Sequence, residues 1–95
     1  MILEWSVFAI ADREAIFDYI ESDSPQAAAD VDDRIRVSVE SLRQFPEMGR
    51  PGRVEGTREL IIQRTPYIAA YRREENTVRV LRVLHGAQQW PEDLH

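Results

Sequence analysis

The stretch that decides the fold reads Thr77-Val78-Arg79-Val80-Leu81-Arg82-Val83-Leu84-His85, followed by Gly86-Ala87-Gln88-Gln89-Trp90-Pro91. The part from Thr77 to His85 is rich in β-branched and aliphatic residues, which predicts a strand. Both of its faces are apolar, with Val78, Val80 and Leu84 on one and Leu81 and Val83 on the other. We therefore expect this strand to lie in the middle of a sheet or to be covered on both faces.

Two shorter runs of strand-like composition precede it, from Arg58 to Gln63 and from Pro66 to Arg72. They are separated by Arg64-Thr65, and the second is separated from Thr77 by only a few polar residues. Such short connections predict antiparallel neighbours. Gly49-Arg50-Pro51-Gly52-Arg53 is predicted to be a loop, because two glycines and a proline cannot continue a helix.

The first half of the chain predicts one strand and two helices. Alternation from Ile2 to Val7 is typical of a strand, and the spacing changes to a helical one from about Ala9 to Ser22. Ser24-Pro25 is a cap followed by a first-turn proline, and it opens a second helix that Pro46 stops. The expected apolar stripes are Ala11, Ala15, Ile16, Tyr19 and Ile20 on the first helix, and Ala28, Val31, Ile35, Val39, Leu42 and Phe45 on the second.

The fold class that follows is α+β, in the order β-α-α-β-β-β. The short link between the helices predicts an antiparallel helical hairpin. We expect this hairpin to pack on one face of a small, mainly antiparallel sheet, which leaves tyrosine and arginine side chains on the other face for a partner. A length of 95 residues suits a single domain spanning 1–95.

Charge is distributed unevenly. Residues 1–40 hold ten acids against three arginines, and residues 41–95 hold nine arginines against seven acids, within a net charge of −5. Such an asymmetry bears on partners more than on fold. The chain has no cysteine and only two histidines, so we expect no metal centre and no cofactor. With no signal peptide and no apolar run long enough for a membrane span, a cytoplasmic protein without a membrane partner is expected.

The motifs, taken together and in order, resemble the RelE/ParE superfamily of bacterial type II toxins. They cover nearly the whole chain and comprise Ala11-Asp12 with Ile16 and Tyr19-Ile20, Ser24-Pro25 with Ala27-Ala28, Leu42 and Pro46 with Gly49-Arg50, Gly56-Thr57-Arg58-Glu59-Leu60, Pro66-Tyr67-Ile68 with Tyr71-Arg72, and Val83-Leu84-His85-Gly86-Ala87 with Trp90-Pro91. The resemblance implies a toxin that arrests growth, is neutralised by a cognate antitoxin and forms a hetero-oligomer with it.

Members of this superfamily have two different activities on one fold, so the fold alone does not choose between them. RelE-like members cleave mRNA on the ribosome, whereas ParE-like members block DNA gyrase without being nucleases. RNA cleavage without a metal needs a base, a cation for the phosphorane and an acid, which RelE-like enzymes take from basic strand residues and a C-terminal aromatic or histidine. This chain has Glu59-Leu60-Ile61-Ile62 and Tyr67-Ile68 where those strands need cations, and its net charge is acidic.

Gyrase inhibition is therefore the favoured hypothesis, and two alternatives stay open. The first alternative is a ribosome-dependent endoribonuclease, whose catalytic residues would be His85, Arg58, Arg64 and Arg82. The second is a degenerate toxin that only binds its antitoxin and regulates their operon. Independently of the choice, the candidate residues for contact with antitoxin or target are Arg58, Tyr67, Tyr71, Arg72, Arg79 and Trp90. Several candidates have a structural alternative: His85 as a ligand of backbone groups, Arg58 in an intramolecular ion pair, the tyrosines as core residues, and Trp90 as the residue that packs the tail onto the sheet.

Overall fold

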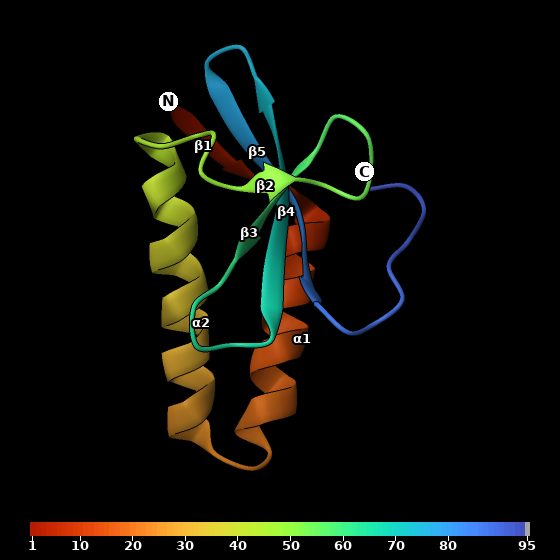
Figure 1. Ribbon diagram of the computed structural model, residues 1–95. Coiled ribbons are helices and arrows are strands. Elements are labelled where there is room, and N and C mark those ends of the chain that lie inside the picture. The colour runs from red at the N-terminus through yellow and green to blue at the C-terminus, as the bar shows by residue number, and fades with distance from the viewer. Residues whose placement is uncertain (95) are drawn as a thin grey trace.

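The computed structural model describes residues 1–94 and forms a two-helix hairpin beside a five-stranded mixed sheet (Figure 1). The α+β class and the order of one strand, two helices and then strands are confirmed. No helix among the described residues is both long and apolar enough to span a membrane. In chain order the elements are β1 (Ile2–Trp5), α1 (Val7–Glu21), α2 (Pro25–Glu40), the 3₁₀ turn η1 (Ser41–Arg43), β2 (Arg50–Pro51), β3 (Arg58–Ile61), β4 (Tyr67–Glu74) and β5 (Thr77–His85).

Strand β5 is an interior strand, as its two apolar faces predict. The strand order is β1-β5-β4-β3-β2, so β5 has a neighbour on each side. It pairs in parallel with β1 and antiparallel with β4, and the remaining pairs are antiparallel. The single parallel pair arises because the helical hairpin lies between β1 and the rest of the sheet in sequence, which is the kind of long crossover a parallel pair requires.

A β-bulge in β5 corrects the expected division of its faces. Tyr71 pairs with Val80 and Ala70 pairs with Arg82, so Leu81 has no opposite residue on β4. The extra residue shifts the alternation by one position. Val83 consequently lies in the core under the helices with Val80, whereas Leu84 lies on the opposite face with Leu81.

The boundary between β1 and α1 differs from the expectation by two residues. Ser6 is the N-cap of α1, and its hydroxyl accepts a hydrogen bond from the Ala9 amide at 3.0 Å. The strand therefore ends at Trp5 and the helix begins at Val7. Val7 continues the alternating pattern of the strand although its side chain is 72% exposed, which explains why the sequence places the boundary too late.

Residues 41–53 also depart from the expectation. Helix α2 ends at Glu40 and tightens into η1, so Phe45 is 59% exposed and not part of the buried stripe. The segment predicted to be a loop contains β2, in which Arg50 pairs with Glu59 and Pro51 with Arg58. β2 is the edge strand of the sheet. Pro51 is tolerated there because its nitrogen points away from β3, where no amide proton is needed.

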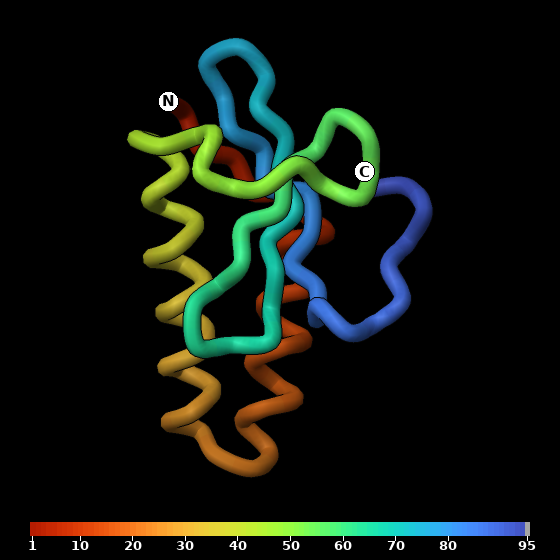
Figure 2. The backbone as a smooth tube through the Cα atoms, viewed as in Figure 1, coloured from red at the N-terminus to blue at the C-terminus, as the bar shows by residue number. Residues whose placement is uncertain are grey.

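Two apolar cores lie on opposite faces of the sheet. The larger one joins the helices to the sheet and includes Ile35, Val39, Leu42, Tyr71 and Val80, all fully buried. The smaller one lies on the other face and contains Ala70, Leu81, Leu84 and Leu94, with Val54 and Trp90 packed against it. The expectation of a free face rich in tyrosine and arginine is therefore wrong. Figure 2 shows the C-terminal segment, in dark blue, returning toward the loop between β2 and β3.

Helix α1 has its expected stripe only in part. Ile16 and Ile20 pack against the larger core, but Ala11, Ala15 and Tyr19 are exposed. Together with Phe8, these exposed residues form a row at helical spacing on the solvent side, and Tyr19 is 76% exposed. The inward positions between the core residues are taken by Asp12 and Arg13, which the sequence pattern places on the wet face.

Candidate functional site

His85 lies at the end of β5, where the chain turns into the C-terminal segment. It pairs with Tyr67 across the sheet, and the two rings meet edge to face with their centroids 5.7 Å apart. Its backbone amide donates to Gln88 Oε1 at 2.9 Å, and its carbonyl accepts from Trp90 Nε1 at 3.1 Å. His85 is therefore a central contact of the turn that folds the tail back.

The imidazole of His85 is also engaged locally. Its Nδ1 accepts a hydrogen bond from the Ala87 amide at 3.0 Å. A ring nitrogen that accepts in this way carries no proton, so in the neutral ring the proton lies on Nε2. Nε2 is then the donor nitrogen and suits a hydrogen-bond contact, while Nδ1 is occupied by the Ala87 amide.

Arg82 is bound to Asp12 of α1. Its Nε and one terminal nitrogen reach the two carboxylate oxygens at 2.7 and 2.9 Å, and the Val83 amide donates to the same carboxylate at 2.9 Å. The hydrogen bonds to Asp12 raise the pKa of Arg82. β1 ends before this part of β5, so Asp12 caps a strand edge that has no strand neighbour. Arg82 is thus a structural residue in this arrangement.

Arg58 and Tyr71 hold the segment that leads into β2. Arg58 donates to the carbonyl oxygens of Gly49 and Glu47 at 2.7 and 3.3 Å. The hydroxyl of Tyr71 accepts from the Gly49 amide at 2.9 Å and donates to the Pro46 carbonyl at 2.8 Å. A Cβ on Gly49 would lie 2.7 Å from this tyrosine ring, so glycine is required there. Burial raises the pKa of Tyr71, which keeps the hydroxyl protonated as a donor.

We predict that Tyr71→Phe lowers the free energy of unfolding by about 1–3 kcal/mol, because it leaves a buried amide and a carbonyl without a partner. The matched control is Tyr67→Phe, on the same strand. The Tyr67 ring is also buried, and burial raises its pKa, but the described residues supply no hydrogen bond to its hydroxyl. Its loss should cost less than about 0.5 kcal/mol. Urea unfolding of both variants measures the difference, and equal losses would contradict the role assigned to Gly49 and Pro46.

The remaining candidate cations are at the surface. Arg64 occupies the turn between β3 and β4 with a φ of 64°, and it makes no ion pair within residues 1–94. Arg79 contacts Glu4 at 3.4 Å and Arg72 contacts Glu74 at 4.0 Å. Both pairs are exposed and so weakly held, which leaves these arginines able to exchange partners.

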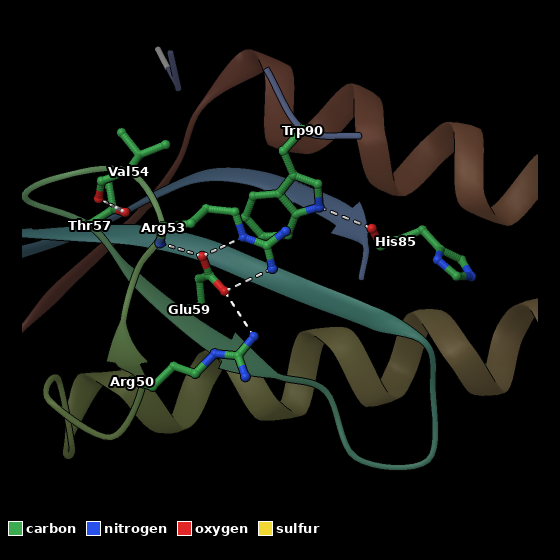
Figure 3. Close-up of polar contacts among 7 residues, drawn as sticks. All are labelled: Arg50, Arg53, Val54, Thr57, Glu59, His85 and Trp90. Atoms are coloured by element: carbon green, nitrogen blue, oxygen red, sulfur yellow. Dashed lines mark hydrogen bonds and ion pairs between the residues drawn. The ribbon is translucent and has the colours of Figure 1, made fainter. Parts of the chain in front are cut away.

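A charged cluster around Glu59 joins the edge of the sheet to the tail (Figure 3). The Glu59 side chain is only 2% exposed, and its carboxylate binds Arg50 at 3.0 Å and both the side chain and the amide of Arg53 at 2.8–3.2 Å. The Arg53 guanidinium stacks on the Trp90 ring at 3.6 Å from its centroid. The predicted packing of Trp90 onto the sheet is confirmed, and Arg53 supplies one side of its site.

The predicted catalytic residues do not converge on one point. His85 pairs with Tyr67, whereas Arg58 pairs with Tyr71, four residues further along β4 and on its other side. At about 3.3 Å per residue the two positions are about 13 Å apart along the strand. Of the three predicted phosphate-binding arginines, only Arg64 lies at the His85 end of the sheet.

Sequence reasoning missed the residues with the densest polar contacts, namely Asp12, Arg50, Arg53 and Glu59. Glu59 did have a signal, since it is an acid in an otherwise apolar strand, which usually means either an exposed position or a buried pair. Nothing in the sequence indicates that Asp12 faces inward. Among residues 1–94 no group of three or more His, Cys, Asp or Glu is placed to hold a metal ion.

Comparison with known proteins gives one consistent result. The model of the family described as ParE toxin of type II toxin-antitoxin system, parDE, matches residues 3–90. A putative toxin of Sinorhizobium fredii, Y4kP, is 44% identical over 97% of this chain and 95% of its own. The toxin RelE2 of Caulobacter vibrioides is 36% identical over 88% of this chain and 93% of its own. A solved structure described as the chromosomal ParDE TA system from P. aeruginosa matches with a TM-score of 0.80 and 34% identity, covering 87% of this chain and 92% of that one. The chain therefore belongs to the ParE toxin family and is the toxin of a type II toxin–antitoxin system.

Proposed function

We propose that this toxin arrests growth by inhibiting DNA gyrase, that it does not cleave RNA, and that a cognate antitoxin neutralises it by direct binding. The observation that carries the choice of target is the state of the predicted catalytic groups. Arg82 is held by Asp12 and Arg58 by two backbone carbonyls. Neither is available to a phosphorane near His85, whose stabilisation needs donors about 3 Å from the charged oxygens.

The local hydrogen bond of His85 supports the same choice. RNA cleavage by its own 2′-hydroxyl needs a base that removes the hydroxyl proton. The acceptor nitrogen of His85 faces the Ala87 amide, so it is not free to take that proton. The overall charge of −5 adds to this argument, because affinity for ribosomal RNA depends mainly on neutralising phosphates.

A protein partner is supported by the surface of α1. Phe8 and Tyr19 are 52% and 76% exposed, and the exposed alanines between them complete an apolar row that residues 1–94 leave uncovered. A contiguous apolar row on a small protein is typical of an interaction surface. Arg72, Arg79 and the open edge of Trp90 remain candidate contacts for antitoxin or target, because their side chains are partly exposed.

The experiment pairs two assays on purified toxin: inhibition of gyrase supercoiling, and mRNA cleavage on programmed ribosomes. The informative variant is His85→Asn, because the Asn oxygen can accept from the Ala87 amide as Nδ1 does, whereas the amide side chain cannot act as an acid or base. We expect wild type and variant to inhibit supercoiling within about twofold of each other, a free-energy difference of about 0.4 kcal/mol. We expect neither to cleave mRNA.

Ribosome-dependent cleavage that disappears in His85→Asn would replace this proposal with the endoribonuclease. The endoribonuclease is supported by the position of His85, Tyr67 and Arg64 at the same end of the sheet. If neither activity is found and expression of the free toxin is harmless, the chain is a degenerate toxin that retains only antitoxin binding. Adding the antitoxin should restore supercoiling, which tests the neutralisation step separately.

A further inference from the structure

The outer edge of β3 is only half covered by β2. The two strands pair at Arg58 and Glu59 and no further, because the chain before Arg50 turns inward at Gly49, whose amide binds Tyr71. Within residues 1–94, Leu60 and Ile61 therefore have no strand neighbour on their outer side. An open strand edge of this kind accepts an added strand from another chain.

The backbone groups of Ile61 point toward that open side. Ile62 donates its amide to the Tyr67 carbonyl of β4 at 3.1 Å. Because successive residues of an antiparallel strand direct their amide and carbonyl to opposite sides, those of Ile61 are directed away from β4. The Ile61 side chain is 48% exposed, so both the polar and the apolar parts of this residue are accessible.

A groove runs along this edge, between α2 and β3. It consists of two hollows of about 320 and 410 Å³ that share Ser38 and Gln63 in their walls. We call it the α2–β3 groove and define it by the residues Arg34, Val37, Ser38, Ile61, Gln63 and Arg64. Figure 1 shows β3 and the turn after it running beside α2.

The composition of the α2–β3 groove indicates what it binds. Val37 lines one hollow and is 53% exposed, and Ile61 lines the other and is 48% exposed, so each hollow offers one accessible apolar side chain. Arg34 and Arg64 make no ion pair with any described residue. The two acids that line the hollows are paired: Asp33 binds Arg36, and Glu59 binds Arg50 and Arg53. The groove therefore has a net positive charge and fits an acidic partner.

We propose that the α2–β3 groove binds an extended acidic segment of the antitoxin, which adds to β3 as an edge strand. The segment would pair with the Ile61 amide and carbonyl, place alternate apolar side chains against Val37 and Ile61, and direct carboxylates to Arg34 and Arg64. This inference rests on the antitoxin binding in the proposed function, and it deepens that function by assigning the site and the chemistry of the bound segment.

The experiment measures the affinity of the intact antitoxin, the product of the gene paired with the toxin gene, for variants of the full toxin. Ile61→Pro removes the outward amide, and the β4 ladder does not use that amide. We expect Ile61→Pro to weaken antitoxin binding at least about tenfold, because one backbone hydrogen bond is lost and the antitoxin strand is displaced from β3. Thermal unfolding of the variant verifies that the toxin still folds.

A second set of variants tests the groove without altering the strand. Arg34→Gln combined with Arg64→Asn removes both free cations, and asparagine tolerates the positive φ of residue 64. We expect binding to weaken several-fold and to lose part of its salt dependence. The matched control is Arg43→Gln, which removes an exposed arginine paired with Glu40, both outside the two hollows, and should bind as wild type does. In wild-type toxin, hydrogen exchange at the Ile61 amide should slow on antitoxin binding.

The possible failures are distinguishable. If wild-type toxin does not bind the antitoxin at all, the antitoxin pairing of the proposed function is wrong and this inference fails with it. If the antitoxin binds but neither set of groove variants weakens it and the Ile61 amide gains no protection, the groove is not the site although the pairing stands. If the free toxin is a dimer that Ile61→Pro converts to a monomer, the edge is occupied by a second copy of the chain, which also overturns the inference.

Discussion

Asp12→Ala is expected to lower the free energy of unfolding by about 3 kcal/mol, the typical cost of leaving a partly buried charge and a strand amide without partners. Asp12 is 14% exposed, and its carboxylate binds both the Arg82 guanidinium and the Val83 amide. Because β1 ends at Trp5, the described part of the chain places no other strand beside Val83 on that edge of β5. In a domain of this size the loss corresponds to a fall in melting temperature of roughly 15 °C.

The matched control is Asp32→Ala. Asp32 forms an ion pair of similar geometry with Arg13, with two contacts of 2.9 Å between α2 and α1. It is 31% exposed and caps no backbone amide, so its loss should cost no more than about 1 kcal/mol. Equal losses for the two variants would contradict the role of Asp12 as a strand cap.

Two further variants separate the contributions of Asp12. Asp12→Asn keeps an oxygen that can accept from the Val83 amide but weakens the pairing with Arg82. Asp12→Ala combined with Arg82→Met removes the unpaired cation, while the Val83 amide still lacks the Asp12 acceptor. If the cation causes most of the loss, the double variant should be more stable than Asp12→Ala alone. Denaturant unfolding at pH 7 measures all of these variants.

The fold could be predicted from the sequence because local patterns and turn residues agree with the final arrangement. Alternation and β-branched residues mark β5, and Ser24-Pro25 marks the start of α2. The same reasoning fails where a tertiary contact overrides a pattern. The bulge at Leu81 exchanges the faces of Val83 and Leu84, and the local sequence pattern does not predict this bulge.

Helix α1 illustrates a different failure. Its apolar residues form two rows, one against the sheet and one in solvent, so periodicity alone does not identify the buried face. On the buried side Asp12 binds the Val83 amide at an edge of β5 that β1 does not reach, a contact that forms only in the folded chain. The sequence pattern does not contain this contact.

Only the packing of two aromatic residues near the candidate site could be predicted from the sequence. Trp90 and Tyr71 were identified as residues with a packing role, and both are packed as the structural alternative predicts. The sequence offers Arg58 and Arg82 as possible phosphate ligands, but Arg82 is held by Asp12, which is far away in sequence, and Arg58 is held by the backbone carbonyl of Gly49. The sequence does not predict the α2–β3 groove. The groove depends on the residue at which β2 stops pairing with β3, and the turn at Gly49 fixes that residue.

Replacing Glu59 is the second change expected to have a large effect. Glu59→Ala should lower the free energy of unfolding by about 2–3 kcal/mol, since it removes the shared acceptor of Arg50 and Arg53 and leaves the Arg53 amide unpaired. The two arginine side chains are 51% and 40% exposed, so water satisfies them in the variant and keeps the loss below that of a fully buried pair. The control is Glu40→Ala, which removes an exposed pair with Arg43 and should change stability by less than about 0.5 kcal/mol.

The contribution of Glu59 should depend on pH in a defined direction. Burial is the largest influence on its pKa and acts to raise it, but the hydrogen bonds from Arg53 and Arg50 together outweigh burial, so the pKa lies below the ordinary value of 4.5. The unfolded chain therefore binds this proton more readily than the folded one, and stability rises with pH through this range. The difference in unfolding free energy between wild type and Glu59→Gln should be constant above about pH 5.5 and should shrink as pH falls below 4.5 toward the folded pKa.

The fluorescence of Trp90 reports on the protonation of Glu59 in the C-terminal segment. Protonation of Glu59 weakens the hold on Arg53, and the Arg53 guanidinium is stacked on the Trp90 ring. The chain has two tryptophans, so a Trp5→Phe background leaves Trp90 as the only one. Its fluorescence should change on acidification before global unfolding, and the change should be absent in Trp5→Phe combined with Glu59→Gln. A tail signal that titrates identically in the two proteins would show that Glu59 does not hold the C-terminal segment against the sheet.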